Sequence, residues 1–254
     1  MFDKMKIKEL EQYSLDSAER TIEHRKIILK KPFFKKLYLY YYNIFLKQIP
    51  SLPKGHFLEI GSGGGFLKDV FPDVITSDIL NLQHCDMKFS AENIPFESGS
   101  LSGIFMVNVF HHIPNCAAFL HEAERTLKKN GKIIMIEPCH SLWGSFIYKY
   151  FHHELFDIKA GWLLEKGSPL SVSNQALAWI VFERDKKIFE EKFPLLKIQK
   201  IQYHTPLRYL LSGGLTWKAL VPSWSFNFFT FFEYILSPVS KCFSMFETII
   251  IIKK

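Results

Sequence analysis

A cluster of glycines directly behind a short apolar run is the feature that most constrains this chain. The stretch "HFLEIGSGGGFL", residues 56–67, places four glycines in five positions. Glycine costs backbone entropy and packs nothing, so such a cluster is typical of a turn where the backbone comes close to a ligand. The pattern predicts a buried strand at 56–60 and a short helix at 65–71, joined by a glycine-rich turn.

Apolar runs and amphipathic stretches continue to alternate after this turn. The sequence predicts further strands at 73–79, 101–108, 132–138, 196–204 and 247–254. An amphipathic helix is expected at 115–131, because its apolar residues recur at helical spacing and "KKNG" is typical of a helix end. Strands that alternate with helices predict a parallel sheet covered on both faces. The last strand, an unbroken β-branched run, has to be inserted into the sheet or paired antiparallel.

The N-terminal region has a different pattern. Residues 6–30 are polar with loosely spaced apolar positions, and we expect them to be helical. Pro32 can open a second helix, whose aromatic and aliphatic residues lie near one face. Pro50 and Pro53 end this region.

Composition excludes several classes of protein. The chain has 254 residues, 48% of them hydrophobic, which is enough for one sizeable core. Residues 1–54 carry 12 Lys and Arg against 6 Asp and Glu, and residues 205–254 carry 5 against 2, while the centre is slightly acidic. This distribution does not resemble a nucleic-acid-binding stripe. The four cysteines are scattered, with no C-x-x-C pair, and are expected to be reduced thiols.

The sequence also bears on location. The first residues are charged and lack the apolar stretch of a signal peptide. No segment reaches the roughly 18 uninterrupted apolar residues that a spanning helix needs. We therefore expect a cytoplasmic protein, neither exported nor integral.

Two common glycine-rich motifs do not fit the turn. In G-x-G-x-x-G counted from Gly61, the third glycine position is Phe66, which would block close packing of helix on strand. A Walker phosphate loop fails because no G-K-[ST] follows. The pattern that remains is E-x-G-x-G-x-G, formed by Glu59, Gly61, Gly63 and Gly65, with Asp78 at the end of the second predicted strand.

This pattern resembles the class I S-adenosylmethionine-dependent methyltransferases, in particular the type 11 branch. "AENIPFESGSLSGIFMVNVFHHI" (91–113) and "FLHEAERTLKKNGKIIMIEP" (119–138) are similar to later blocks of that family, in the same order. The likeness covers about residues 54–140. It implies an α/β fold: a Rossmann-like, doubly wound sheet of seven mostly parallel strands with an antiparallel last strand, to which a helical N-terminal region and aromatic cap insertions are added.

The resemblance also implies roles for individual residues. The glycines would pass beside the methionine and ribose parts of S-adenosyl-L-methionine, Glu59 would orient their loop, and Asp78 would hold the ribose hydroxyls. The residues expected along the adenine and the methionine end are Ala91, Glu92 and Asn108. Ser90 departs from the family, which commonly has an acid at that position.

On this basis we expect a single methyltransferase domain over residues 1–254. Its predicted parts are a helical N-terminal cap (1–53), the cofactor-binding core (54–140), a substrate-side insertion (141–195), and the last two strands (196–254) with an aromatic insertion at 205–246.

Methyl transfer from a sulfonium is an in-line displacement, so the enzyme mainly aligns the reactants in a dry site. A hydroxyl acceptor also needs a base, and the candidates at the carboxyl ends of strands are His112, Glu137 and His140. His112 is the preferred base. The sequence "HHE" at 152–154 hints at a metal, but no third ligand has a convincing spacing, so we expect no metal site.

The acceptor has to be inferred from the segments outside the sheet. Residues 205–246 are rich in Trp and Phe and poor in charge, which suits either a cap over the site or a membrane-facing surface. We expect a small-molecule, glycan or lipid-linked acceptor, as in cell-envelope glycan or glycolipid synthesis, with peripheral attachment to the inner face of the membrane as a possibility. The alternatives are an RNA methyltransferase, although no N-P-P-Y-like tetrapeptide follows residue 107, and a non-catalytic S-adenosylmethionine-binding module.

Overall fold

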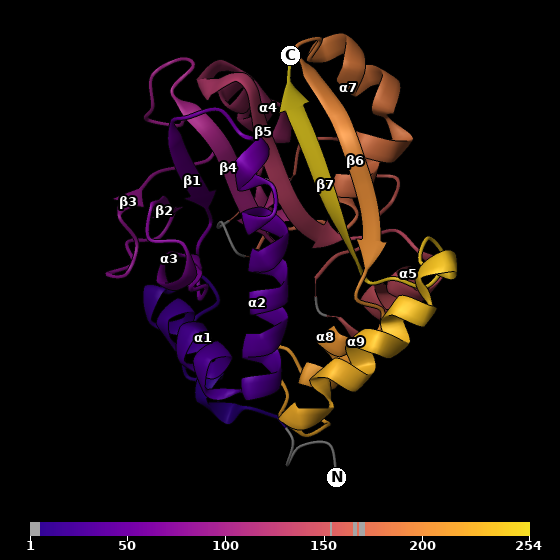
Figure 1. Cartoon of the computed structure of the whole chain (residues 1–254). Helices are drawn as coiled ribbons and strands as arrows, with labels where there is room; N and C mark the ends of the chain where they lie inside the picture. The colour runs from indigo at the N-terminus through magenta and orange to yellow at the C-terminus, as the bar shows by residue number, and fades with distance from the viewer. Residues whose placement is uncertain (1–5, 153, 165–166, 168–170) are drawn as a thin grey trace.

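The protein is described here by a computed structural model that covers residues 6–152, 154–164, 167 and 171–254. One mixed sheet forms its centre, with the strand order β3-β2-β1-β4-β5-β7-β6. Its strands are β1 (His56–Ile60), β2 (Val74–Asp78), β3 (Met87–Lys88), β4 (Leu101–Val107), β5 (Leu127–Pro138), β6 (Leu196–His204) and β7 (Phe246–Lys253). Figure 1 shows the sheet with the helical N-terminal region and α9 at one end.

Pairing within the sheet explains the unusual last strand. The first five strands pair in parallel with one another, whereas β7 lies between β5 and β6 and is antiparallel to both. Both partners of β7 are strands, and its residues up to Ile251 are buried or nearly so, which is why its run of isoleucines is unbroken. The predicted fold class, including the insertion of the last strand, is confirmed.

Helices cover both faces of the sheet and gather at one end. They are α1 (Ala18–Lys30), α2 (Pro32–Leu46), α3 (Leu67–Val70), α4 (Cys116–Thr126), α5 (Leu142–Phe151), α6 (Leu177–Trp179), α7 (Lys186–Lys192), α8 (Arg208–Ser212) and α9 (Phe226–Ile235). The short turns are η2 (Lys8–Leu10), η3 (Ile49–Ser51), η4 (Phe110–His112), the π-helical η5 (Ile180–Arg184), η6 (Ser223–Ser225) and η7 (Ser237–Val239). Helices α4, α6 and α7 pack in the apolar core on one face, and α2 packs in the core on the other.

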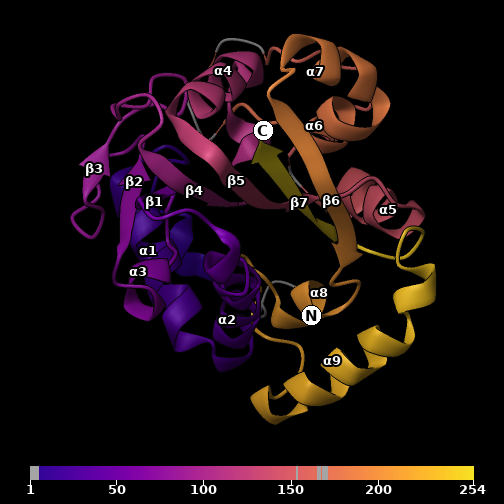
Figure 2. The same cartoon turned by 45° about the horizontal axis from the view of Figure 1, so that its top comes forward.

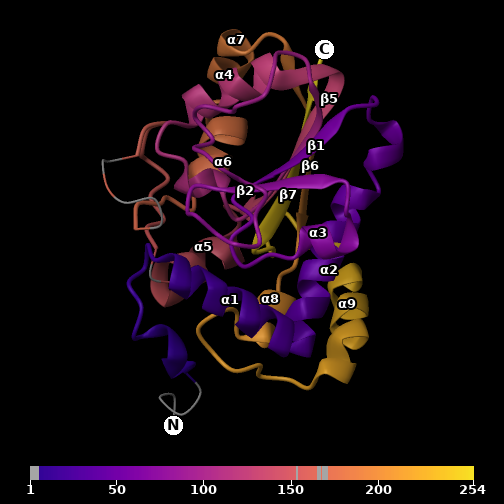
Figure 3. The same cartoon turned by 90° about the vertical axis from the view of Figure 1, so that its left-hand side faces the viewer.

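The carboxyl ends of the parallel strands face a separate group of helices. Figures 2 and 3 show α1 and α8 beyond this edge of the sheet, with α9 beside them. Helix α1 begins after Ser17, whose side chain accepts a hydrogen bond from the backbone of Arg20, and α2 begins at Pro32 as predicted. Ligands of open parallel sheets bind at this edge, so these helices enclose the expected site.

Two predicted elements have different bounds. The helix expected at 115–131 ends at Thr126, because Leu127 is fully buried and pairs with Leu101 as the first residue of β5. Asn130 then takes a left-handed conformation with φ of 65°, so "KKNG" forms an irregularity in the strand instead of a helix end. The helical region expected at 6–30 begins as a regular helix only at Ala18. No helix among the described residues is long and apolar enough to cross a membrane.

Candidate active site

A cavity of about 320 Å³ lies at the carboxyl edge of the sheet. It is lined by the glycine-rich turn after β1, the residues that follow β2 and β4, the helices α1 and α2, and parts of the segment 141–195. Of the residues predicted from the sequence, those that line it are Glu59, Gly61, Gly63, Gly65, Asp78, Ser90, Ala91, Asn108 and His112.

Two glycines of the turn have left-handed backbones, with φ of 64° at Gly61 and 48° at Gly63. A Cβ on Gly61 would lie 2.6 Å from the side chain of Val109, so this glycine lets the turn pack against the end of β4. A Cβ on Gly63 would meet only the carbonyl oxygen of Gly61, at 3.7 Å. Gly63 therefore keeps open a part of the cavity that a larger residue would fill.

Asp78, the last residue of β2, holds this turn in place. One carboxylate oxygen accepts from the backbone N–H of Gly63 and the other from that of Leu80, each at 2.9 Å. Each oxygen keeps a further lone pair, so the carboxylate can also accept from ligand hydroxyls. Burial raises the pKa of Asp78, because a carboxylate loses hydration there.

Glu59 lies behind the turn and is fully buried among apolar and hydroxyl groups. Its carboxylate accepts from the Ser62 hydroxyl at 2.6 Å. Burial raises its pKa to about 7, and the Ser62 hydrogen bond opposes this rise only in part. A cationic ligand beside it would favour the ionised form.

Asn108 marks the end of β4 at the cavity wall. Its backbone φ is 56°, unusual for a residue other than glycine, and its side-chain oxygen is buried without a hydrogen-bond partner among the described residues. A buried unpaired amide oxygen is costly unless a ligand donates to it. This acceptor, the open space at Gly63 and the Asp78 carboxylate fit a ligand that carries hydroxyl and ammonium donors, as S-adenosylmethionine does.

Of the residues expected beside the adenine, two line the cavity and one does not. Ser90 and Ala91 line the cavity, and the Ser90 hydroxyl accepts from the backbone N–H of Glu92 at 3.2 Å. Glu92 does not line the cavity. Its carboxylate accepts from the backbone N–H of Asn115, the N-cap of α4, at 2.7 Å. In this structure Glu92 positions α4 and does not border the cavity.

Glu137, one of the predicted bases, is fully buried and does not line the cavity. One oxygen accepts from the backbone N–H groups of Val109 and Phe110, each at 2.8 Å, and the other accepts from Nδ1 of His111 at 2.6 Å. With its lone pairs engaged in this way, Glu137 fixes the turn η4 and the ring of His111. Glu137 therefore acts by positioning these groups and not as a base in the cavity.

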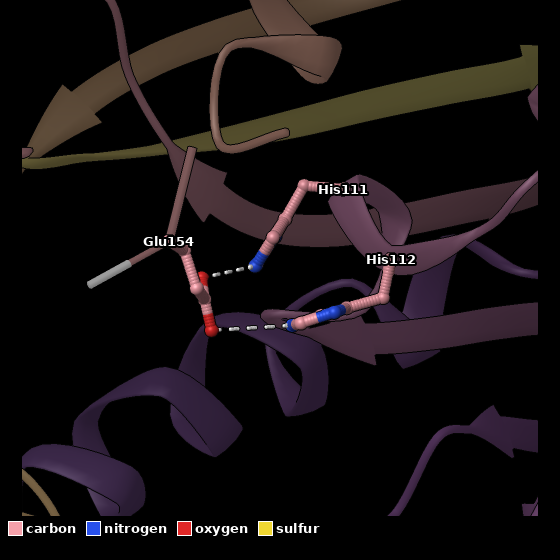
Figure 4. Close-up of side chains that lie close together, drawn as sticks. All are labelled: His111, His112 and Glu154. Atoms are coloured by element: carbon pink, nitrogen blue, oxygen red, sulfur yellow. Dashed lines mark ion pairs between the residues drawn. The ribbon is translucent and has the colours of Figure 1, made fainter. Parts of the chain in front are cut away.

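His111 and His112 both face the cavity, where they meet Glu154 (Figure 4). A carboxylate oxygen of Glu154 lies 3.5 Å from Nε2 of His111, and the other lies 3.7 Å from Nε2 of His112. The sequence around Glu154 gives no sign of this partnership, because the two histidines precede it by some forty positions. His153, part of the "HHE" stretch, lies outside the described residues.

His140, the third predicted base, lies elsewhere. Its ring packs on Trp179 with 4.3 Å between the ring centroids and on Phe156 at 6.0 Å, and it does not line the cavity. Of the three predicted bases, only His112 faces the cavity.

Charges within the cluster set its protonation. Burial lowers the pKa of His111, but the carboxylates of Glu137 and Glu154 outweigh burial and raise it to about 10. Burial and the neighbouring His111 charge lower the pKa of His112 to about 4. The histidines hold the pKa of Glu154 well below its usual range, although burial alone would raise it. At neutral pH the cluster contains an ionised Glu154 carboxylate, a protonated His111 and a neutral His112 imidazole.

The N-terminal helices also contribute side chains to the cavity. The sequence predicted these helices but not which of their residues line the cavity. Arg20, Thr21 and His24 of α1 line the cavity, as do Tyr38 and Tyr42 of α2. The Tyr42 hydroxyl accepts from the backbone N–H of Phe66 at 2.8 Å, so α2 is tied to the glycine-rich turn. No sequence motif marks these residues. Their helical spacing next to core residues is the feature of the sequence that could have indicated them.

Comparisons with known proteins agree with this geometry. Residues 58–135 match the family described as methyltransferase domain. A search of curated protein sequences found no match. A geranyl diphosphate C-methyltransferase from Streptomyces coelicolor A3(2), solved with Mg²⁺, geranyl diphosphate and S-adenosyl-L-homocysteine, has a TM-score of 0.53 at 11% identity, over 91% of this chain and 84% of that chain. A possible histamine N-methyltransferase from Thermotoga maritima has a TM-score of 0.52 at 16% identity, over 98% and 100% of the two chains.

The match to the methyltransferase domain over residues 58–135, together with the fold and the cavity, supports S-adenosylmethionine-dependent methyltransferase activity. The matched region is less than half of the chain, and the cofactor that it implies is S-adenosyl-L-methionine. When bound, this cofactor supplies an activated methyl group. The residues around it bind, orient and exclude water.

Proposed function

We propose that this enzyme methylates a hydroxyl group of a lipid-linked acceptor, a glycan or lipid, that it meets at a membrane surface. Cell-envelope glycan or glycolipid synthesis would present such an acceptor. The observation that carries the proposal is the orientation of α9, whose apolar side faces outward.

Two polar residues of α9, Thr230 and Glu233, point into the protein. Glu233 is 8% exposed, and its carboxylate accepts from Nε of the buried Arg208 at 2.6 Å. The hydroxyl of Thr230 accepts from the same guanidinium at 3.1 Å. The one charged residue of the helix is therefore used internally.

The outward side of α9 and the turn before it is aromatic. Trp224 is 78% exposed, and Phe228 and Phe231 are each 63% exposed. Tyr234 and Ile235 extend the same exposed surface. A helix that faces water normally shows the opposite arrangement, with polar residues outside, and an exposed apolar surface of this kind is typical of a site of interaction.

Charge at the ends of this segment favours lipid as the partner. Lys218 precedes the aromatic surface and Lys241 follows it, and both are exposed. Tryptophan, phenylalanine and tyrosine beside lysine suit the boundary between acyl chains and anionic head groups.

Helix α5 connects an exposed apolar surface with the cavity. Tyr148 lines the cavity, while Phe146, Tyr150 and Phe151 of the same helix are exposed. An acceptor with an apolar chain could keep that chain at the membrane surface while its polar group enters the cavity.

The polar group would then lie beside His111, His112 and Glu154. We propose that this cluster, whose two histidines follow Asn108 by a few residues, contacts the acceptor hydroxyl and assists the loss of its proton. The surrounding rings of Tyr38, Tyr148 and other residues would exclude water from the reaction.

The division of the chain predicted from the sequence belongs to the same proposal. The N-terminal cap (1–53) would close the cofactor side, where Arg25 donates to the carbonyl of Gly65 and pairs with Asp69 at 3.0 Å. The insertion 141–195 would form the acceptor side, since Tyr148, Glu154 and Gln175 come from it.

Sedimentation with liposomes tests the membrane contact. We expect the wild-type protein to bind vesicles of anionic lipid at low salt, and the double variant Trp224→Ala, Phe228→Ala to bind at least ~10-fold more weakly, because each exposed ring contributes apolar area at the interface. The matched control replaces two exposed apolar residues at the other end of the molecule, Ile188→Ala with Leu195→Ala, and should bind as wild type.

Two results would overturn the membrane contact. In one, wild-type protein stays in the supernatant with every lipid composition. In the other, the protein is a dimer in solution that the double variant dissociates, which would mean that the aromatic surface is covered by a second copy.

A further inference from the structure

Three side chains that could bind a metal ion converge in the cavity, and the activity described so far does not require one. His111, His112 and Glu154 each offer a donor atom, and these atoms all lie within 4.8 Å of one another. Figure 4 shows the carboxylate of Glu154 facing both imidazole rings, with one oxygen directed at each. The turn η4 provides both histidines, and the segment after α5 provides the glutamate.

The ring of His111 is held as a ligand would be. One oxygen of Glu137 accepts from two backbone N–H groups, and Nδ1 of His111 donates to the other at 2.6 Å. This leaves Nε2 of His111 facing the cavity, where a metal ion would displace its proton. Metal-bound histidines usually donate their other ring N–H to a carboxylate or carbonyl in this way, which fixes the tautomer and makes the ligand more basic.

The carboxylate of Glu154 is oriented as well. Nε2 of Gln175 donates to one of its oxygens at 2.8 Å, and the same amide lies 2.8 Å from Nδ1 of His152. Nδ1 of His152, at 4.0 Å, and the two histidines of η4 therefore border a carboxylate whose direction is set by Gln175. Such supporting contacts are the usual surroundings of a binding site.

The separations suit one ion. Donor atoms bound tetrahedrally at the usual zinc–ligand lengths lie roughly 3.3 Å apart. One oxygen of Glu154 lies 3.5 Å from Nε2 of His111 and the other lies 3.7 Å from Nε2 of His112. One donor atom from each of the three residues lies within 4.8 Å of the others, so rotations of these side chains would bring the donors to that spacing.

We propose that His111, His112 and Glu154 bind a divalent transition-metal ion, with Zn²⁺ as the representative. Two imidazoles and one carboxylate are a donor set that such ions prefer over Mg²⁺ or Ca²⁺. Three protein ligands leave a position open, and the cavity lies on that side. Open positions distinguish catalytic metal sites from structural ones.

The role of this ion rests on the proposed function. The acceptor hydroxyl would occupy the open position, where the ion favours loss of its proton to solvent. The oxygen then attacks the methyl carbon in line, the carbon–sulfur bond breaks with its electron pair going to sulfur, and S-adenosylhomocysteine leaves. Nε2 of His112 would serve as a ligand in this arrangement, so it could not also act as the general base expected from the sequence.

Metal binding by the untagged, full-length protein tests the proposal without any methyl acceptor. After dialysis against a chelator, the protein is titrated with Zn²⁺ in a calorimeter and with Co²⁺ in a spectrophotometer. We expect one ion per chain and a visible cobalt absorption of nitrogen- and oxygen-bound Co²⁺. His112→Ala and Glu154→Gln should each weaken binding by at least ~10-fold, and the surface variant His121→Ala should bind as wild type.

The two variants must still bind S-adenosylhomocysteine like wild type, which shows that they are folded. A stoichiometry far below one ion per chain would overturn the proposal, and so would binding that neither variant weakens; the cluster would then be a buried ion pair between His111 and Glu154. If the protein binds no metal but methylates a lipid, only this inference fails. If it binds metal and methylates no lipid, only the proposed acceptor fails.

Discussion

The cofactor side and the acceptor side of the cavity are built in different ways. The cofactor side comes from residues at or directly after the ends of β1, β2 and β4. Backbone groups of the glycine-rich turn form part of this side, and Asp78 accepts hydrogen bonds from backbone N–H groups. The acceptor side combines η4 with segments some forty or more residues away, such as Glu154 and Gln175. A local motif can encode the first side, whereas only the folded chain assembles the second.

Gly63→Val should have the largest effect and should affect the cofactor side alone. The new side chain would occupy the open space of the cavity and would also require φ of 48°, which valine avoids. We expect no detectable binding of S-adenosylhomocysteine by calorimetry.

Gly99→Val is the matched control, because Gly99 has φ of 66° but nothing lies within 4 Å of a Cβ there. This variant carries the same backbone strain and should bind the cofactor product like wild type. Equal loss of binding in both variants would mean that strain, and not occupied space, explains the effect.

Glu233→Ala should break the support of the acceptor side. It leaves the guanidinium of Arg208 buried without its partner, which costs about 3–5 kcal/mol of the free energy of unfolding. Denaturant titration measures this change. Glu190→Ala, which removes an exposed ion pair with Lys186, should change stability by less than ~0.5 kcal/mol. Equal stabilities of the two variants would contradict the structural role of the Arg208–Glu233 pair.

His112→Ala should impair the acceptor side and leave the cofactor side unchanged. Turnover should fall by about 10², the usual scale for a group that activates the nucleophile, whether as a base or as a ligand. Affinity for S-adenosylhomocysteine should stay close to that of wild type. Turnover is measured with labelled S-adenosylmethionine, and a variant with wild-type turnover would remove His112 from the mechanism.

Glu59 should give cofactor binding a modest pH dependence. Burial raises its pKa to about 7 in the free protein, and the cationic groups of S-adenosylmethionine favour the ionised carboxylate, so binding releases a proton. Affinity should therefore rise roughly tenfold from pH 6 to pH 8 and level off above. Of the charged groups that face Glu59, Asp78 raises its pKa and Arg25 lowers it, and both effects are smaller than that of burial. Glu59→Gln should flatten the profile; an unchanged slope would assign the proton to another group.

The sequence predicted the strands and the turn beside the cavity well because their signals are local. The bounds of β1, the glycine-rich turn and the position of Asp78 at the end of β2 all follow from residues within one strand–turn–helix–strand unit. Where the prediction differs from the structure, a tertiary contact decides the outcome. Leu127 leaves the helix to pair with β4, and Glu92 turns to the N-terminus of α4.

The acceptor side could not be predicted to the same extent. Glu137 stands at the end of its strand as expected, but three hydrogen bonds engage its carboxylate, and the sequence contains no sign of them. Glu154 becomes a partner of His111 and His112 only when α5 brings it back over the sheet edge. The aromatic residues of 205–246 were visible in the sequence, but the inward direction of Glu233 was not.

Transfer of labelled methyl groups to fractionated cell extracts tests the central claim most directly. Wild-type protein is incubated with labelled S-adenosylmethionine and separate lipid, glycan and RNA fractions, with Gly63→Val as the inactive control. The account predicts that label enters the lipid fraction with wild-type protein and not with the variant. Label that enters only RNA, or only water-soluble molecules, would contradict a lipid-linked acceptor.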